Sequence, residues 1–481
     1  MTKFEAVIGL EIHAQLKTKT KLFCACPNSF GDEPNKNICP VCTGQPGVLP
    51  VINKKAIELA IKTALGFGSE IQKESIFARK NYFYPDLPKN YQISQYEKPL
   101  ALGGYLEIGD PAKPKKIGLT RIHLEEDAGK LVHQGSAAIA GASGSLVDFN
   151  LTGVPLLEIV SEPEITSAEE AKEYVENLRE TLIYLDVSEA NLEEGNLRCD
   201  ANVSVRPVGE KNLGVKTEVK NLNSLRALQK ALEFEIDRQI EVIKNGQKIT
   251  QETRHWDEKS GTTVALRSKE ESHDYRYFPE PDLIPLKVSK DWIEEIKKEL
   301  PELPDRKKKR FMAEFGLSLY DVEILVSDKN LAEFFEATVK IYNNPKKIAN
   351  WISGEILSFI NEKNESFLKI KISPAELASL VKMVETGKIS GPVGKKILKQ
   401  MLESGQALAE ILKKGDQAQI SDKQTLLPII EKIIAANPQS VADYKAGKEN
   451  ALQFLVGGVM RQTEGRANAQ KVLELLKNQL K

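Results

Sequence analysis

The stretch Glu5-Ala-Val-Ile-Gly-Leu-Glu-Ile-His-Ala-Gln-Leu16 indicates the fold, because it is a long run of strand character. Further short β-type runs follow it, and Gly, Pro, Asn and Asp residues separate them. Helical patterns interrupt these runs, so this part of the chain predicts an α+β fold with an antiparallel sheet. The further strand-type runs are 116–122, 145–150, 156–161 and 202–205.

Three helices are expected among these strands. The second begins with Ser167-Ala-Glu-Glu170, which matches a capping box, and the third closes on Gly246. Beyond about residue 291, strands nearly vanish and a helical period takes over, and the composition changes again near Gly405. The expected helices are 54–65, 167–185 and 224–245, and the expected domains are a catalytic α+β domain at 1–290, an all-α helical domain at 291–405 and a small all-α tail domain at 406–481.

The composition is typical of a soluble globular protein. The 481 residues are 41% hydrophobic and 28% charged, and the chain is longer than one hydrophobic core usually serves. No stretch approaches the roughly 20 apolar residues of a membrane span, and Met1-Thr-Lys-Phe-Glu5 shows no signal region. We therefore expect a cytoplasmic protein without membrane contact. The formal net charge is −1, so a nucleic acid would have to bind local basic patches.

Four of the five cysteines are close together in the sequence. They form a Cys-x-Cys pair and a Cys-x-x-Cys pair about a dozen residues apart. In a reducing compartment such pairs suit tetrahedral zinc better than disulfides, and four thiolates would make the site structural, because they leave no open position for a substrate. The alternative is a loop with four reduced cysteines and no metal. The predicted zinc ligands, within a knuckle at 24–42, are Cys24, Cys26, Cys39 and Cys42.

The segment from Ala78 to Tyr96 combines aromatic, cationic and turn-forming residues without a periodic core pattern. Its aromatic rings could stack on bases or on a ribose, and its cations could contact phosphates. The alternative is an ordered loop held by aromatic packing. The aromatic residues are Tyr82, Phe83, Tyr84, Tyr91 and Tyr96, and the cations are Arg79, Lys80 and Lys89.

Two strand-type segments carry carboxylates and imidazoles at a spacing of two. Glu11 and His13 should project from one face of their strand, and the same holds for His123, Glu125 and Asp127. If the two strands are neighbours, these groups converge on an oxygen-rich cluster that suits magnesium. The alternative is a solvated sheet face. Further candidates for the cluster are Glu126, Asp148 and Glu158.

Seven ordered blocks of the chain resemble the B subunit of the glutamyl-tRNA(Gln)/aspartyl-tRNA(Asn) amidotransferases. The resemblance spans the length of the chain. The blocks are Val7-Ile-Gly-Leu-Glu-Ile-His13, Ala78 to Tyr96, Thr120-Arg-Ile-His-Leu-Glu-Glu-Asp-Ala-Gly-Lys130, Pro155-Leu-Leu-Glu-Ile-Val-Ser-Glu-Pro163, Arg198-Cys-Asp-Ala-Asn-Val-Ser204, Asp274-Tyr-Arg-Tyr-Phe-Pro279 and Phe454-Leu-Val-Gly457.

This resemblance implies an ATP-dependent ligase. ATP would phosphorylate the side-chain carboxylate of Glu on tRNA(Gln), of Asp on tRNA(Asn), or of both, and ammonia would then displace phosphate to leave an amide. Matching positions imply magnesium at Glu11, His13 and Glu125, and catalytic roles for these residues and Glu126. Because the sequence contains no glutaminase motif, ammonia must come from a partner. The resemblance implies an amidase-type A subunit and a small C subunit.

The sequence contains no phosphate-binding fingerprint of the P-loop, kinase or dinucleotide type. ATP use therefore rests on the resemblance. One departure from the family pattern is Leu151, where the resemblance implies an arginine. Candidate ATP contacts are Arg79, Lys80, Arg121, Lys130 and Arg198, and candidate tRNA contacts are Tyr82, Tyr84, Arg461, Arg466 and Lys471.

Two other functions are compatible with these residues. A noncatalytic RNA-binding scaffold would use the cysteine knuckle and the aromatic segment only to present tRNA to a catalytic partner. A metal hydrolase would use the Glu/His cluster without tRNA or ATP. The basic run Arg306-Lys-Lys-Lys-Arg310 is either an RNA contact or a solvated helix face. The ordered blocks favour the amidotransferase.

Overall fold

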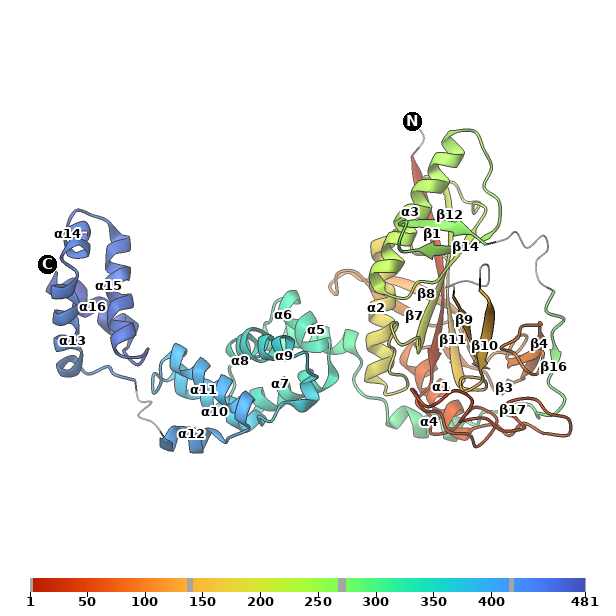
Figure 1. The fold of residues 1–481 in the computed structure, drawn as a ribbon, viewed down its shortest axis with the longest axis horizontal. Coiled ribbons are helices and arrows are strands. Elements are labelled where there is room, and N and C mark those ends of the chain that lie inside the picture. The colour runs from red at the N-terminus through yellow and green to blue at the C-terminus, as the bar shows by residue number, and fades with distance from the viewer. Residues whose placement is uncertain (1–2, 136–141, 267–273, 415–418, 481) are drawn as a thin grey trace. The chain divides into compact units, whose positions relative to one another are not determined.

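The computed structural model describes residues 3–135, 142–266, 274–414 and 419–480. The chain forms two compact units, Met1–Lys307 and Lys308–Lys481. In the described residues every named strand lies in the first unit, and the second unit is built from helices (Figure 1). The α+β class predicted from the sequence is confirmed.

A ten-stranded sheet forms the centre of the first unit, in the order β15-β14-β13-β12-β1-β11-β8-β6-β2, with β7 also paired to β8. Only β13 and β14 pair in parallel, so the sheet is mixed, although its other pairs are antiparallel as expected. The predicted runs fall within or close to strands. The strands are β1 Phe4–Gln15, β2 Glu70–Ile71, β6 Ala101–Leu102, β7 Tyr105–Ile108, β8 Lys115–Glu126, β11 Pro155–Ser161, β12 Leu197–Pro207, β13 Thr217–Lys220, β14 Thr253–Asp257 and β15 Thr262–Ala265.

Three long helices accompany the sheet, close to the predicted positions: α1 Lys54–Gly66, α2 Ala168–Tyr184 and α3 Leu225–Lys244. Ser167 caps α2 by accepting a hydrogen bond from the Glu170 amide at 3.1 Å. In a capping box the Glu170 carboxylate would accept a hydrogen bond from Ser167 N. Here it accepts from Thr166 N instead. A fourth helix, α4 Lys290–Lys298, lies near the end of this unit.

Strand β1 separates the hydrophobic core from a polar face. Ile8, Leu10 and Ile12 are at most 1% exposed and belong to a core that also contains residues of α1, α2 and α3. Successive side chains of a strand point to opposite faces, so Glu11 and His13 project away from this core. On the other side of the sheet from α2 and α3, Figure 1 shows smaller strand groups. These are β16 Phe278–Pro279, β4 Ala78–Asn81 and β5 Tyr91–Ser94; β9 Lys130–Gln134 with β10 Gly144–Asp148; and β3 Glu74–Ser75 with β17 Leu286–Lys287.

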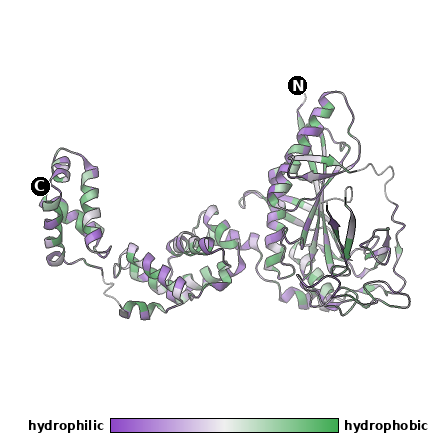
Figure 2. Cartoon of the chain, in the orientation of Figure 1, coloured by the Kyte–Doolittle hydropathy of each residue, from purple (hydrophilic) through white to green (hydrophobic). Residues whose placement is uncertain are grey.

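The helices of the second unit carry both hydrophobic and hydrophilic residues (Figure 2), and most of their buried residues are apolar. Residues between Leu426 and Leu480 form a hydrophobic core of their own, which supports the predicted tail domain at 406–481. The domain division stays a prediction. None of the described helices is both long and apolar enough to cross a membrane. The helices are α5 Pro304–Phe315, α6 Leu319–Val326, α7 Lys329–Ile341, α8 Pro345–Trp351, the π-helix Ile352–Ile356, α9 Leu357–Lys363, the 3-10 helix Phe367–Lys369, α10 Pro374–Glu385, α11 Gly391–Ser404, α12 Leu408–Lys414, α13 Lys423–Ala436, α14 Pro438–Lys445, α15 Glu449–Gln462 and α16 Ala469–Gln479.

Candidate active site and metal centres

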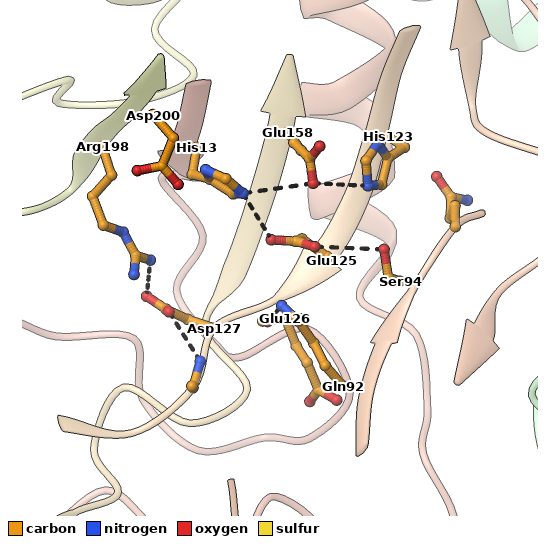
Figure 3. A network of polar contacts seen from close by, with 12 residues as sticks. His13, Gln92, Ser94, His123, Glu125, Glu126, Asp127, Glu158, Arg198 and Asp200 are labelled. Carbon is orange, nitrogen blue, oxygen red and sulfur yellow. Dashed lines mark hydrogen bonds and ion pairs between the residues drawn. The ribbon is translucent and has the colours of Figure 1, made fainter. Parts of the chain in front are cut away.

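Strand register places four functional side chains in one row across the polar face of the sheet. His13 on β1 lies opposite Arg198 on β12 and opposite Glu158 on β11. Glu158 in turn lies opposite His123 on β8. Directly opposed residues of antiparallel strands point to the same face and lie close enough to interact. The row therefore brings two imidazoles and a carboxylate together, with Glu125 beside them (Figure 3).

The centre of this row is a potential cation site. His13 Nε2 lies 3.4 Å from Glu125 Oε1 and 3.5 Å from Glu158 Oε2. The ligand atoms of these three residues all lie within 4.8 Å of one another. His123 Nε2 lies 3.3 Å from Glu158 Oε2, so it supports the carboxylate from the far side. Two carboxylates and one imidazole form an oxygen-rich donor set, which fits a hard divalent cation.

Electrostatics support the same conclusion. Burial disfavours the imidazolium of His13, but its hydrogen bond to Glu158 and the charges of Glu125 and Glu158 outweigh burial and raise the pKa of His13 to about 9. Burial also opposes ionisation of Glu158, yet the neighbouring His123 and His13 hold its pKa well below the usual range. The imidazolium thus supplies the positive charge that a metal ion would supply. The residues present fit a divalent cation.

Glu11 and Glu126 lie next to this group of three without joining it. Asn202 donates a 2.9 Å hydrogen bond to Glu11 Oε1, and burial together with the charges of Glu158 and Glu218 raises the pKa of Glu11. Glu126 is 2% exposed, accepts from the Ile93 amide at 2.9 Å and forms an ion pair with Lys89. The roles predicted for Glu11 and Glu126 stay predictions. Asp148 lies elsewhere, where it accepts from Asn35 N of the cysteine knuckle.

Aromatic rings from two distant segments lie beside the carboxylates. Tyr96 stacks on Tyr277 with ring centroids 4.0 Å apart, and Tyr82 contacts Tyr275 edge-on at 5.9 Å. Burial and the charges of Glu125 and Glu158 raise the pKa of Tyr277, which reports how near this ring lies to the cation site. The sequence singled out both segments, but not their pairing. Tyr84 is 52% exposed and contacts the Tyr82 ring at 6.5 Å.

Two predicted cations lie over the rings, Lys80 and Arg121, whose guanidinium is 5.8 Å from the centre of the Tyr96 ring. Lys80 is the one over Tyr275 and Tyr82. Its Nζ lies 5.0 Å from the centre of the Tyr275 ring and 5.9 Å from that of Tyr82, and among the described residues no carboxylate pairs with it. Arg121 donates to the carbonyls of Tyr96 and Gln95.

The other predicted phosphate contacts have different surroundings. Arg198 pairs with Asp127 at 2.6 Å, and Lys130 is exposed at the start of β9. Lys80 is thus the candidate best placed to meet a negatively charged substrate group beside the rings.

Arg79 already has carboxylate partners. Its guanidinium donates two 2.7 Å hydrogen bonds to Glu280, a side chain with no exposed surface, and lies over the Tyr91 ring at 4.2 Å. This pair joins β4 to β16, across 201 positions of sequence. In this structure Arg79 therefore clamps the segment that carries Tyr275 and Tyr277.

Replacing Arg79 with methionine is expected to destabilise this segment by about 3 kcal/mol, because it leaves the buried Glu280 carboxylate without a counter-charge. Hydrogen exchange should accelerate at the amides of Asn81 and Glu280, which donate to Tyr275 O and Phe77 O. The double variant Arg79→Met/Glu280→Gln should recover much of the loss. Unchanged exchange in the single variant would contradict the clamp.

The four clustered cysteines form a second potential metal centre. Their Sγ atoms lie within 4.8 Å of one another, and all five cysteines of the chain are free. Cys39 N donates to Cys42 Sγ at 3.2 Å. A hydrogen bond from Cys24 lowers the pKa of Cys42 to about 4, although burial opposes this shift. The same hydrogen bond, together with burial, raises the pKa of Cys24. The donor set and its closeness fit a tetrahedral metal.

Two family models match the chain. The first is the GatB/GatE catalytic domain, over residues 6–294, and the second is the GatB domain, over residues 333–480. The first alone covers more than half of the sequence and contains both potential metal centres. The chain belongs to the GatB family.

Relatives of this GatB chain match along its whole length. Two proteins named as the B subunit of aspartyl/glutamyl-tRNA(Asn/Gln) amidotransferase, from Carboxydothermus hydrogenoformans and Moorella thermoacetica, are each 52% identical to it, over 480 and 478 residues. The alignments cover at least 99% of both chains. The protein of that name from Thermodesulfovibrio yellowstonii is 53% identical over 474 residues, 98% of each chain. The resemblance seen in the sequence is confirmed.

The predicted tRNA contacts in the tail of the GatB chain lie on its last helices or just between them. Arg461 on α15 lies over the Phe454 ring at 5.9 Å, and Lys471 on α16 pairs with Glu474 at 3.3 Å. Arg466 donates to Thr463 O. Part of the basic run 306–310 is engaged in ion pairs, since Lys307 pairs with Glu302 and Arg310 with Glu336.

Sequence reasoning missed two partners in the GatB catalytic domain and gave a third too little weight. It named Glu158 only as a further candidate, although this carboxylate lies between the two histidines. It did not identify Glu280 as the partner of Arg79, nor Lys21 beside the cysteines. Lys21 was detectable in principle, because it is the cation directly before Leu22-Phe23-Cys24. Its Nζ donates to Phe149 O, in the turn that includes Leu151.

Proposed function

We propose that this GatB chain is the B subunit of a tRNA-dependent amidotransferase, a carbon–nitrogen ligase that forms Gln-tRNA(Gln) and Asn-tRNA(Asn) in protein synthesis. Its substrate is tRNA that carries glutamate or aspartate in place of the cognate amide. The observation that carries the proposal is the convergence of His13, Glu125 and Glu158 beside the tyrosine rings, in a chain that matches the named relatives throughout.

The proposed reaction has two steps. An oxygen of the side-chain carboxylate first attacks the terminal phosphorus of ATP, and ADP leaves with the electron pair of the broken phosphorus–oxygen bond. This activation is needed because a carboxylate itself resists attack by ammonia. Ammonia then attacks the acyl carbon, a carbon–nitrogen bond forms, and phosphate leaves with the electron pair of the broken carbon–oxygen bond. Bound magnesium would neutralise negative charge on the phosphates during phosphoryl transfer.

The residues of the chain have separate roles in this scheme. His13 and Glu125 hold the magnesium ion, Glu158 and Glu11 complete its surroundings, and His123 keeps Glu158 oriented. Lys80 contacts a phosphate or the substrate carboxylate, since its ammonium lies over the Tyr275 ring and has no carboxylate partner in the part of the chain that the structure describes. Tyr82 and Tyr84, with Tyr275 and Tyr277, offer faces on which the terminal adenosine of the tRNA can stack.

The four cysteines bind one structural zinc ion, which orders the knuckle at 24–42. The knuckle docks on the end of β10 and the turn that follows. Asn35 N donates to Asp148 Oδ1 at 3.0 Å, and Asn37 N donates to Asn150 Oδ1 at 2.9 Å. Ammonia comes from an amidase-type A subunit, and a small C subunit secures the assembly.

Reconstitution of the three-subunit complex tests the proposal. With ATP, glutamine and each mischarged tRNA, the amino acid released from tRNA should change from glutamate to glutamine or from aspartate to asparagine. A complex that hydrolyses glutamine but cannot use ATP with charged tRNA, even when supplied with free ammonia, would support a scaffold. Turnover without tRNA or ATP would support a hydrolase.

Removal of residues 406–481 is expected to raise the KM for charged tRNA by at least about tenfold, because phosphate contacts made by the tail are lost. Within this segment, residues between Leu426 and Leu480 share a hydrophobic core of their own. Within the intact chain, Arg461→Gln and Lys471→Gln should each reduce the salt dependence of tRNA binding by about one unit of slope. Filter binding across a range of salt concentrations measures the affinity for tRNA and its salt dependence.

Glutamine hydrolysis by the partner subunit, measured without tRNA, serves as the control for the truncation and should change little. A truncated complex that stays soluble and binds tRNA with unchanged affinity and salt slope would show that the tail is only a packing domain.

A further inference from the structure

Lys21 is a buried cation in the wall of the cysteine site. Its side chain has no exposed surface. Its Nζ lies 3.7 Å from Cys42 Sγ and 3.3 Å from Phe149 O. Among the described residues no carboxylate forms an ion pair with this ammonium. The Cys42 sulfur, which would carry a negative charge as a thiolate ligand of a metal, therefore lies within its reach.

Burial of an unpaired ammonium is costly, so a fully buried lysine needs a nearby negative charge. Four thiolates supply this negative charge, because they carry four negative charges together and a divalent ion offsets only two of them. An ammonium beside one of them offsets part of the excess and donates a hydrogen bond to sulfur. Such partners outside the ligand shell tune metal affinity. Lys21 is placed for this role by its backbone, since Lys21 N donates to Cys26 O within the same knuckle.

The contacts of Lys21 also reach toward Glu126. A side-chain carbon added at Gly153 would lie 3.5 Å from Cys42 Cβ, 3.6 Å from Lys21 Cδ and 3.8 Å from Glu126 Oε2. Gly153 thus lies between the cysteine site and the Glu126 carboxylate. Because Lys21 binds Phe149 O, it ties the thiolates to the turn that leads to Gly153.

We propose that Lys21 is the counter-cation of the four-cysteine centre and determines how tightly this centre retains zinc. The proposal rests on the proposed zinc site. It makes Lys21 a positioning residue outside the ligand shell. A lysine that only filled space and bound Phe149 O would affect stability but not the metal.

The test compares Lys21→Met with wild type and with Lys19→Met, in the full-length chain. Methionine keeps an unbranched apolar stem and removes the charge, and Lys19 is an exposed lysine two positions away. In chelator competition, Lys21→Met should bind zinc about 10- to 100-fold more weakly than wild type, whereas Lys19→Met should match wild type.

Cobalt substitution gives a second readout that a space-filling role would not change. Without the ammonium, the thiolate sulfur is richer in electrons, so the thiolate-to-cobalt charge-transfer band of Lys21→Met should shift to longer wavelength. Wild-type zinc affinity together with an unchanged band would overturn the proposal. If wild type binds neither metal, the proposed zinc site itself fails.

A variant that does not fold leaves a measurement on wild type. In an experimental structure of the zinc-loaded chain, Lys21 Nζ should remain within hydrogen-bonding distance of Cys42 Sγ. An ammonium turned away from the thiolates in that structure would contradict the inference.

Discussion

Replacing Glu125 with glutamine is expected to reduce tRNA-dependent ATP hydrolysis and amide formation by about 1,000-fold or more, because a lost metal ligand removes several kcal/mol of charge stabilisation from phosphoryl transfer. Glutamine keeps the shape of the side chain and removes its charge. Glu125 is 3% exposed, and its Oε1 lies 3.4 Å from His13 Nε2. We expect similar losses for His13→Ala and Glu11→Ala, and for Glu158→Gln.

The affinity for charged tRNA should stay close to that of wild type in these variants, since none of the substituted residues is a proposed tRNA contact. Mn²⁺ binding followed by electron paramagnetic resonance should weaken in parallel with activity. Glu169→Gln, at an exposed position on α2, makes the same chemical change and should leave both measurements unaltered. Recovery of product on addition of ammonium chloride would show that the defect lies in ammonia delivery, and would remove Glu125 from the phosphoryl-transfer step.

Loss of the zinc ion is the second large effect that we expect. Protein purified without chelator should contain one zinc per chain, and Cys39→Ala should contain none. The thermal unfolding midpoint of the catalytic unit should fall by roughly 6–12 °C, because at least about 3 kcal/mol of metal-dependent folding free energy is lost. The knuckle has few large buried side chains to compensate, since Phe30 is 73% exposed and Ile38 is 38% exposed.

Cys199→Ala is the matched control for the cysteine variant. This cysteine lies on β12 in the core of the unit, outside the cluster of four. The control should keep its zinc even if packing changes alter its stability. Wild-type protein free of zinc, or a Cys39→Ala variant that melts like wild type, would rule out the proposed centre.

The mechanism depends on a sheet whose two faces are used differently. One face is packed with apolar side chains against helices, which holds β1, β8, β11 and β12 at defined register. A shift by one residue would turn His13 into the core and Ile12 toward the site. The buried face therefore holds the candidate metal ligands in place, because a slip of any one strand would expose the apolar residues of that strand.

Local features of this fold were predictable from the sequence. Strand-type runs, the serine cap of α2 and the spacing of the cysteines all reflect interactions between residues near one another in the chain. The prediction that Glu11 and His13 share a face needed only the two-residue repeat of a strand. These inferences hold because backbone geometry alone imposes the periods.

Only the tertiary structure decided which distant residues meet. Strand order placed Glu158 between His13 and His123. Spacing along the chain could not distinguish Glu158 from Glu11 as the carboxylate beside His13. The pairing of Arg79 with Glu280 and the stacking of Tyr96 on Tyr277 join segments that are about 200 residues apart in the sequence. Lys21 is a buried counter-cation because the chain folds its ammonium against a thiolate. The sequence alone determined which chemical groups are present and how they are spaced locally. The tertiary structure determined which of those groups act together, because strand register and burial depend on the packing of the whole sheet.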